Sequence, residues 1–509
     1  MKNCISRGVF FTLTTGLLFI LLNLLTQTNV YAQKTDNLWT DVPGNAVAAK
    51  GIRLTIPQKY RTLSLNVNGM RGLLAQAPHE KSTSLRSSTA IVTLPLPDGK
   101  SARFRFVENS TMAPDLAARF PEIRTFTGVG VDDRSLTATF DFTPAGFHGM
   151  IHSVENGLSF IDPYSQGDID NYIVYAKKDY VPGENKKFIE VGVIGENSEI
   201  AKKIAERVAQ KKNLRMAAQG NATSDRPSGD QLRTYRAAIA ATAEYTAFHG
   251  GTVSNALAAI NTTLNRVNFI YIREVAIKMQ LVSNETNIIY TSNPDPYSNG
   301  NGGAMLDENQ SNINAQIGSA NYDIGHVFGT NSGGVAYLGV ICDASYKARG
   351  VTGSGSPIGD AFDVDYVAHE MGHQFGANHT FNGSAGSCSG NRNAGTAFEP
   401  GSGSTIMSYA GICSPQDLQR NSDAYFHVAS YDEIFAYSEI NEGNSCAVVT
   451  SSGNTAPAPT IVTTNNLTIP KQTPFTITGS ATDIQNDPIT YNWEQYDLGP
   501  GRQPYFAFG

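Results

Sequence analysis

The sequence lacks several features that would assign it to a class at once. Beyond residue 32 no uninterrupted apolar run approaches the roughly 18 residues of a membrane-spanning helix, so no membrane segment is expected in the mature chain. Lys and Arg total 38 against 45 Asp and Glu, which argues against nucleic acid as a main partner. Gly and Pro make up 71 of 509 residues, too few for a low-complexity chain, and internal repeats are absent.

Cysteine is scarce and unevenly placed. The chain has five, and none lies between residues 33 and 341. Cys342, Cys388, Cys413 and Cys446 fall within 105 residues. An even number in a secreted chain indicates two disulfides, and their connectivity stays open at this point.

The N-terminus is typical of a secretory signal peptide over residues 1–32. Two basic residues precede a mostly apolar stretch, and Val30-Tyr31-Ala32 fits a cleavage site. We therefore expect a secreted or cell-surface protein with no membrane anchor in its mature form. An uncleaved anchor is the alternative.

Composition divides the rest of the chain into units. Residues 33–215 carry 24 Lys and Arg against 20 Asp and Glu, whereas residues 216–509 carry 12 against 25. Alternating phenylalanines predict a β-rich first unit, including a hairpin whose turn lies at Thr143–Gly146. A basic, Gly- and Ser-rich stretch follows, and we interpret residues 216–230 as a linker and processing region, or as a plain interdomain linker.

Residues 231–446 form the second unit, with a strand–helix–strand–helix–strand order. That order predicts an α/β layer with a mostly parallel sheet. The expected strands and helices are Leu232–Tyr245, Val253–Val267, Val275–Leu281, Leu306–Gly318 and Tyr322–Phe328.

After a predicted linker over residues 447–459, residues 460–509 look like part of a β module. Pro474–Thr478 and Ile489–Trp493 are its expected strands. Because a β-sandwich needs about 100 residues, we expect only a partial sandwich here.

A short segment of the second unit carries the clearest chemical signal. His369 and His373 are four residues apart, so on a helix they share one face and can bind one metal ion. Glu370 follows the first histidine, which sets its carboxylate beside the ion rather than on it. Gly376 can adopt a positive φ and turn the chain, so that His379 becomes a third ligand.

Three imidazoles with an open fourth position are typical of a catalytic zinc site. Zinc polarises a peptide carbonyl and lowers the pKa of water toward ~7, and Glu370 can take the proton and pass it to the leaving amine. The extended motif fixes five positions, which makes it specific. A surface helix with spare histidines is the alternative.

A methionine supports this interpretation. Met407 lies 28 residues after His379, within Ile406-Met407-Ser408-Tyr409. With both motifs the sequence resembles the metzincin clan of zinc endopeptidases, and residues 231–446 are most similar to reprolysins (adamalysin-like proteases) of a bacterial secreted type. The resemblance implies a zincin fold with a mixed, mostly parallel sheet. It also implies the zinc ligands His369, His373 and His379, the general base Glu370 and the Met-turn residue Met407.

The sequence departs from the usual reprolysin pattern at three points, which bear on the subfamily to which it belongs. Thr380 replaces the usual Asp after the third histidine, the usual Cys of the Met-turn is missing, and Tyr409 follows Met407 by two residues, as in serralysins and astacins. The resemblance implies that Tyr409 could stabilise an oxyanion. A pocket-wall tyrosine is the alternative.

The resemblance also implies a substrate-binding strand and a disulfide pattern. In metzincins an edge strand before the zinc helix pairs antiparallel with extended substrate. Here that strand is Val335, Ala336, Tyr337 and Leu338, or an ordinary edge strand. Since Cys388 and Cys413 both belong to the lower lobe, the expected pairs are Cys388–Cys413 and Cys342–Cys446.

Metzincins of this layout are made with an inhibitory propeptide, here residues 33–215. Because that region has no cysteine, a cysteine switch is excluded. Asp230 is one candidate for a blocking carboxylate. A simpler hypothesis is that the basic propeptide is held on its acidic partner by long-range attraction, which high salt would weaken.

The sequence thus predicts a secreted zinc metalloendopeptidase, made as a zymogen, that acts on proteins as a monomer. Ca²⁺ is a possible second metal, with ligands that the sequence does not place. One alternative is a surface adhesin with an inactive metzincin domain. Another is a zinc hydrolase that is not a protease.

Overall fold

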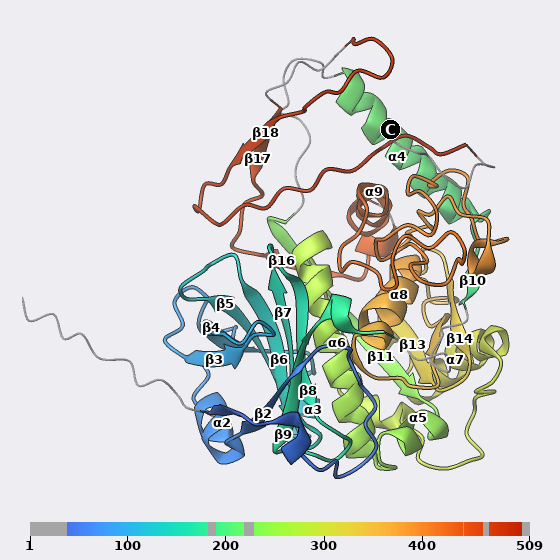
Figure 1. Ribbon diagram of the computed structural model, residues 1–509. Coiled ribbons are helices and arrows are strands. Elements are labelled where there is room, and N and C mark those ends of the chain that lie inside the picture. The colour runs from blue at the N-terminus through green and yellow to red at the C-terminus, as the bar shows by residue number, and fades with distance from the viewer. Residues whose placement is uncertain (1–37, 182–189, 218–228, 441, 462–467, 501–509) are drawn as a thin grey trace, which may run out of the picture. The chain divides into compact units, whose positions relative to one another are not determined.

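The computed structural model describes residues 38–181, 190–217, 229–440, 442–461 and 468–500 (Figure 1). These residues belong to one compact unit, Leu38–Gly509. The predicted signal peptide and most of the predicted linker 216–230 lie outside the described residues. Among the described residues, no helix is both long and apolar enough to cross a membrane.

The N-terminal part folds into a nine-stranded antiparallel sheet with the order β1-β2-β9-β8-β7-β6-β5-β4-β3. The predicted hairpin is β6–β7, in which Phe142 pairs with Phe147 beside the turn. The prediction of a β-rich unit is thereby confirmed. Its elements are β1 (Trp39–Asp41), β2 (Arg61–Leu65), α2 (Val67–Leu74), β3 (Ile91–Pro95), β4 (Ser101–Asn109), α3 (Pro114–Arg119), β5 (Arg124–Gly130), β6 (Thr137–Thr143), β7 (Gly146–Ser153), β8 (Gly157–Pro163) and β9 (Asn171–Ala176).

This N-terminal sheet is buried on both faces. Successive side chains of a strand point to opposite faces. Met150 and Phe160 therefore enter a core shared with the second half of the chain, while their neighbours Ile151 and Ile161 enter a separate core.

The second half contains the predicted α/β layer, built on the sheet order β10-β14-β15-β13-β11-β12 with β16 beside β11. Four strand pairs are parallel, and β14–β15 and β11–β16 are antiparallel, which confirms a mixed, mostly parallel sheet. Its elements are β10 (Glu190–Ile194), α4 (Glu199–Ala217), β11 (Gln231–Ala241), α5 (Ala243–Phe248), α6 (Val253–Val275), β12 (Ile277–Leu281), α7 (Gly302–Gln316), β13 (Ile324–Gly329), β14 (Gly333–Tyr337), β15 (Gly350–Gly353), α8 (Ala368–Gln374), α9 (Val428–Phe435) and β16 (Val448–Ser451).

Several boundaries differ from the predictions. The first strand stops at Ala241, because the Thr242 side chain accepts a hydrogen bond from Tyr245 N and starts α5. Residues 448–451, expected in a linker, form β16 on the main sheet.

The C-terminal part also differs from the prediction. Its strands are β17 (Ala458–Ile461) and β18 (Gly479–Thr482), rather than residues 474–478 and 489–493. Phe475 and Trp493 in those expected strands are more than half exposed, so the described residues provide no facing layer that would bury them.

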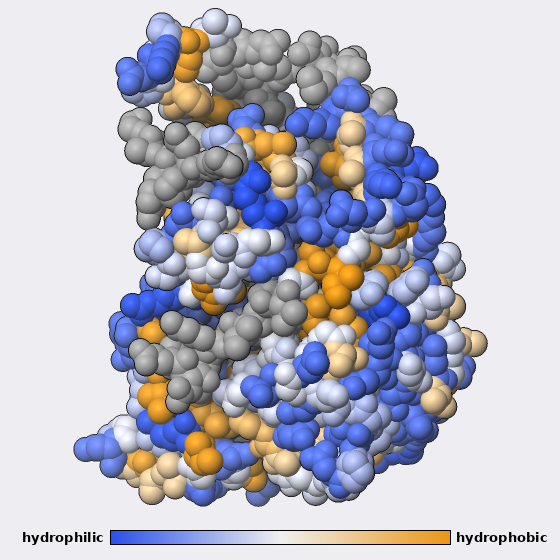
Figure 2. Space-filling view, turned by 90° about the vertical axis from the view of Figure 1, so that its right-hand side faces the viewer, coloured by the Kyte–Doolittle hydropathy of each residue, from blue (hydrophilic) through white to orange (hydrophobic). Residues whose placement is uncertain are grey.

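The surface view shows how polar and apolar residues are distributed over one face of the molecule (Figure 2). Hydrophilic residues cover most of the face in Figure 2, and hydrophobic residues gather near its middle.

Helix α6 is the central element of the core, between the two sheets (Figure 1). Thr252 caps its N-terminus by accepting a hydrogen bond from Asn255 N. Its apolar residues recur every three or four positions, as predicted, and of that series Leu257, Ile260, Leu264 and Val267 are buried. The helix ends at Ala276, which adopts a left-handed conformation with φ 53°.

A left-handed alanine is strained because its Cβ crowds the backbone, and glycine has no Cβ. We expect Ala276→Gly to raise the free energy of unfolding by about 0.5–1 kcal/mol in urea denaturation. Ala259→Gly, within the same helix, should lower it by a similar amount. Equal destabilisation by both substitutions would contradict this account of the helix end.

Candidate metal site

The metal-binding motif lies where two helical segments join. A π-helix over Ala361–Val367 runs directly into α8, which carries His369 and His373 on one face. Gly376 follows with φ 95°, so the predicted sharp turn is confirmed. The turn brings His379 to the other two histidines, and the three side chains are buried.

The three rings converge through their Nε2 atoms. His373 Nε2 lies 3.0 Å from His369 Nε2 and 3.1 Å from His379 Nε2. Each Nδ1 lies 2.7 Å from a backbone carbonyl oxygen, those of Ile406, Ala377 and Asn391. A carbonyl can only accept, so each Nδ1 carries the proton and each Nε2 presents a lone pair.

Lone pairs so close together repel unless a cation lies between them. Nitrogen ligands about 2.0–2.1 Å from a tetrahedral zinc ion would be about 3.4 Å apart, close to the observed spacing. Burial lowers the pKa of His369 to about 4 and those of His373 and His379 well below the usual value. The rings are therefore neutral at physiological pH, as metal ligands must be, and they fit zinc.

Met407 lies against the zinc-binding helix. A Cβ on Gly372 would come within 2.4 Å of Met407 Sδ, so the close approach requires glycine at position 372. Met407 is fully buried, and its carbonyl accepts a hydrogen bond from Thr380 N.

Tyr409 lies beside the ligands. Its ring centroid is 4.6 Å from that of His379 and 5.7 Å from that of His369. It also packs on Phe381, at 4.4 Å.

Two carboxylates fix the segment that presents the third histidine. Buried Glu433 accepts hydrogen bonds from Asn378 N and Nδ2, and burial raises the pKa of Glu433 to about 7. Glu399 accepts hydrogen bonds from the Thr380 hydroxyl, from Thr405 N at 3.0 Å and from the Thr405 hydroxyl at 2.6 Å. Glu399 therefore joins the residue after the third histidine to the Met-turn.

The disulfides of the structure are Cys342–Cys446 and Cys388–Cys413, the pairs that the resemblance implies. Cys388 and Cys413 pack with Phe381 and Tyr409 in a small buried cluster. This bridge therefore braces the region next to His379.

The expected substrate strand is not at the edge of the sheet in this structure, because it is paired on both sides. Val335, Ala336 and Tyr337 belong to β14, which pairs with β15 on one side and with β10 on the other. Leu338 N extends the second pairing by donating to Ile194 O. The outermost strand is thus β10, from the region predicted to be a propeptide, which the sequence analysis did not place in this sheet.

Glu370 is fully buried on α8, one residue after the first ligand. Asp230, the candidate blocking residue, lies beside β16, where its carbonyl accepts a hydrogen bond from Ser452 N. Among the described residues, the three histidines are the one group of at least three His, Cys, Asp or Glu side chains placed to hold a metal.

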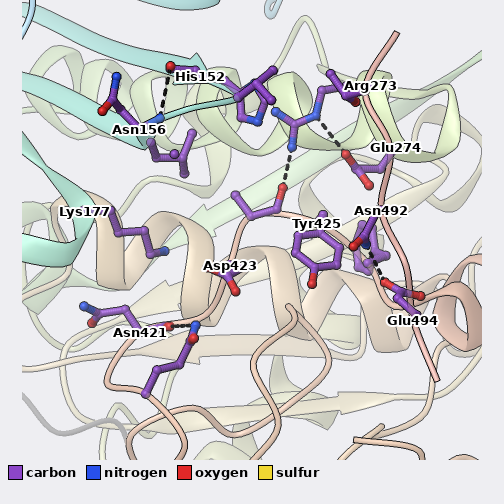
Figure 3. Close-up of a pocket in the computed structure, with 18 of the residues that line it drawn as sticks. His152, Asn156, Lys177, Arg273, Glu274, Asn421, Asp423, Tyr425, Asn492 and Glu494 are labelled. Atoms are coloured by element: carbon purple, nitrogen blue, oxygen red, sulfur yellow. Dashed lines mark hydrogen bonds and ion pairs between the residues drawn. The ribbon is translucent and has the colours of Figure 1, made fainter. Parts of the chain in front are cut away.

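A cavity of about 1210 Å³ lies apart from the three histidines, none of which lines it. His152 and Arg273 face each other across one end of it (Figure 3). Arg273 donates to Glu274 and to Ala424 O. Burial and the charge of Arg273 lower the pKa of His152 to about 4.

Sequence reasoning missed Glu399 and the carbonyls that orient the ligands. The one signal for this region is that Thr380 stands where reprolysins usually carry Asp, which singles out the position to which Glu399 binds. The carbonyls leave no signal, because every residue has one.

Replacing Glu399 should weaken metal binding without removing a ligand. In Glu399→Gln an amide N–H faces donors that need an acceptor. We expect about 10-fold weaker zinc binding, measured by chelator competition, together with a changed absorption spectrum of the Co²⁺-loaded protein. The exposed carboxylate variant Asp307→Asn should match the wild type in both measurements. An unaltered zinc affinity and spectrum in Glu399→Gln would show that Glu399 does not position the site.

Comparison with known proteins agrees with the geometry. Residues 231–435 match the family described as reprolysin-like metallopeptidases, M12B. The chain has no match among curated proteins. The matched residues include the α/β layer except β10, α4 and β16, together with the buried three-histidine site and the Met-turn segment. Residues 231–435 are therefore a reprolysin-like metallopeptidase domain of the M12B family.

Proposed function

We propose that this protein is a secreted zinc endopeptidase, made as a zymogen, that hydrolyses peptide bonds of other proteins. The observation that carries the proposal is the convergence of three neutral Nε2 lone pairs within a reprolysin-like domain, with Glu370 one residue after the first of them. Two disulfides favour an extracellular location. We also propose that the protein is bacterial and that it is a monomer.

His369, His373 and His379 would hold the zinc ion. When bound, zinc supplies Lewis acidity, which polarises the scissile carbonyl and makes water more acidic. Glu370 is the proposed general base, whose carboxylate takes a proton from the attacking water and delivers it to the leaving amine. Tyr409, whose ring lies beside two of the ligand rings, is the proposed donor to the developing oxyanion.

The outer side of β14 is the proposed binding edge for an extended substrate. Backbone groups of Val335, Ala336, Tyr337 and Leu338 would pair with the peptide antiparallel and present its scissile bond to the metal site. Such backbone pairing is compatible with many sequences, which suits a protease that acts on unfolded protein.

Two alternatives remain distinguishable by experiment. An adhesin with an inactive domain would bind zinc stoichiometrically and cleave no unfolded protein. A zinc hydrolase with another substrate would be inactive on proteins but active on small esters or amides. The intact Glu370 argues against the first, and the substrate-strand geometry against the second.

The decisive test is Glu370→Ala, assayed on casein after cleavage at a protease site engineered into residues 218–228. Because the substitution removes the base but no ligand, we expect casein cleavage to fall about 10²–10⁴-fold while zinc stays bound. A strong chelator should abolish wild-type cleavage, and added zinc should restore it. Asp307→Ala, a surface carboxylate, should keep full activity. Undiminished cleavage by Glu370→Ala would overturn the mechanism.

We further propose that β10 keeps the uncleaved chain inactive by covering the substrate strand. β10 runs parallel to β14, whereas a substrate is expected to run antiparallel. A Cβ on Gly192, which has φ 108°, would come within 2.8 Å of Asn391 Oδ1, and the carbonyl of Asn391 orients His379. β10 is thus fitted closely against the metal site.

Gly192→Val should release this inhibition, because valine is strained at positive φ and meets Asn391. We expect the uncleaved variant to hydrolyse a fluorogenic peptide about 10-fold faster than the uncleaved wild type, equivalent to ~1.4 kcal/mol of lost pairing. The control Gly157→Val carries similar strain, at φ 67°, in the β7–β8 turn, where a Cβ meets open space. If both variants stay as inactive as the wild type, β10 is not the inhibitor.

A further inference from the structure

The N-terminal sheet does not pack on the metallopeptidase domain as a removable cover would. Met150, Phe160 and Tyr175 on one face of the sheet share a continuous core with Ile260 and Leu264 of α6. Separation would expose this face to water, while its other face keeps a core of its own.

Buried ion pairs also join the N-terminal region to the metallopeptidase domain. Arg266 of α6, whose side chain is 3% exposed, binds Asp162 of β8 at 2.6 Å and Asp363 of the π-helix at 2.9 Å. Lys177, just after β9, binds Asp360 and Asp365 at 2.9 Å each. Asp360, Asp363 and Asp365 lie in or directly before the π-helix that continues into the metal-binding helix.

The metallopeptidase domain alone does not contain an oppositely charged partner for each of these buried groups. Without the sheet, the domain would keep three carboxylates, Asp360, Asp363 and Asp365, with Arg266 as their one cation from this network. Breaking a buried ion pair by removing one partner is strongly destabilising, because the remaining charge stays uncompensated.

Backbone hydrogen bonds also join the N-terminal region to the metallopeptidase domain. Leu281, at the end of β12, donates to Thr111 O at 2.8 Å and accepts from Ala113 N at 2.9 Å. The segment after β4 therefore pairs in parallel with the end of β12, a strand of the α/β layer.

The β10–α4 segment, residues 190–217, is attached differently. Among its described side chains, Ala201 and Ile204 are the buried apolar ones, and Ile204 is the one that enters the shared core, with Ile200 and Val208 packed against it. Its ion pair Lys203–Glu442 is exposed on both sides, and Lys211–Asp432 is the more buried contact. Its main hold on the domain is the pairing of β10 with β14.

We propose that residues 38–180 are a permanent subunit of the peptidase, and that only the β10–α4 segment has to leave. Cleavage within residues 182–189 and 218–228 would release β10 and α4, while the sheet stays bound and supports the π-helix. The retention of the sheet is independent of the proposed protease function, whereas the role of the departing segment rests on it.

This differs from the expectation based on net charge, in which high salt would loosen the N-terminal region. At 0.1 M salt, interactions between exposed charges more than about 10 Å apart are largely screened, whereas buried pairs are screened far less. Salt also does not weaken an apolar core. The association should therefore persist at high salt.

The test uses the full chain with Glu370→Ala, which prevents self-digestion, and a site for one specific protease inserted in each of the two segments. After cleavage, size-exclusion chromatography is run in 0.15 M and 1 M NaCl. We expect the sheet fragment to elute with the metallopeptidase fragment at both salt concentrations, and the 190–217 peptide to elute separately. Separate elution of the sheet fragment would overturn the proposal, as would retention of the peptide.

A matched lysine pair tests the buried charges. In the cleaved protein, Lys177→Met should raise the dissociation constant of the sheet fragment at least 10-fold in analytical ultracentrifugation. The neighbouring Lys178→Met, at an exposed position, should leave it unchanged. Equal effects of the two variants would show that the Lys177 network does not hold the sheet. Neither measurement depends on catalysis, so a failure of the proposed function would leave their outcome readable.

Discussion

Each metal ligand is held in orientation by a hydrogen bond from its Nδ1 to a backbone carbonyl, and the three carbonyls belong to separate segments. Ala377 lies in the turn after α8, Asn391 in the loop beyond the third ligand, and Ile406 at the Met-turn. For three lone pairs to meet within a few ångströms, all three segments must be fixed at once. Glu399, Glu433 and the Cys388–Cys413 bridge connect these segments, which explains buried carboxylates and a disulfide so close to a metal site.

The same requirement extends toward the N-terminal sheet. The metal-binding helix continues from a π-helix whose aspartates pair with Arg266 and Lys177, and Lys177 comes from the end of the sheet. The hydroxyl of Tyr271 in α6 also donates to Ala368 O at the start of α8. Support for the metal site and pairing with β14, the proposed substrate strand, thus fall to different parts of the region that the sequence suggests is one propeptide. The first part contributes a whole sheet face to the shared core, whereas the second adds Ile204 to that core and is paired along one strand.

Much of the metallopeptidase domain could be predicted from local patterns. Helix α6 follows from apolar spacing, the β6–β7 hairpin from alternation around a turn, and the metal site from a motif within one helix and one turn. Predictions failed where pairing is long-range. β16 lies in a Ser- and Thr-rich stretch that has the composition of a linker, yet it pairs with β11, more than 200 residues earlier. The tail strands were misplaced because alternation marks a segment able to form a strand but not the partner it needs.

By itself, the sequence determined which side chains bind the metal, because their spacing on a helix and a glycine turn brings them together by local geometry. Only the tertiary structure decided which carbonyls orient them, that Glu399 joins Thr380 to the Met-turn, and that β10 pairs with β14. It also decided that the sheet and α6 share one core. These contacts join residues far apart in the chain, and backbone groups or ordinary carboxylates make most of them. Their energy depends on burial and on a partner, and neither is encoded in the local order of residues.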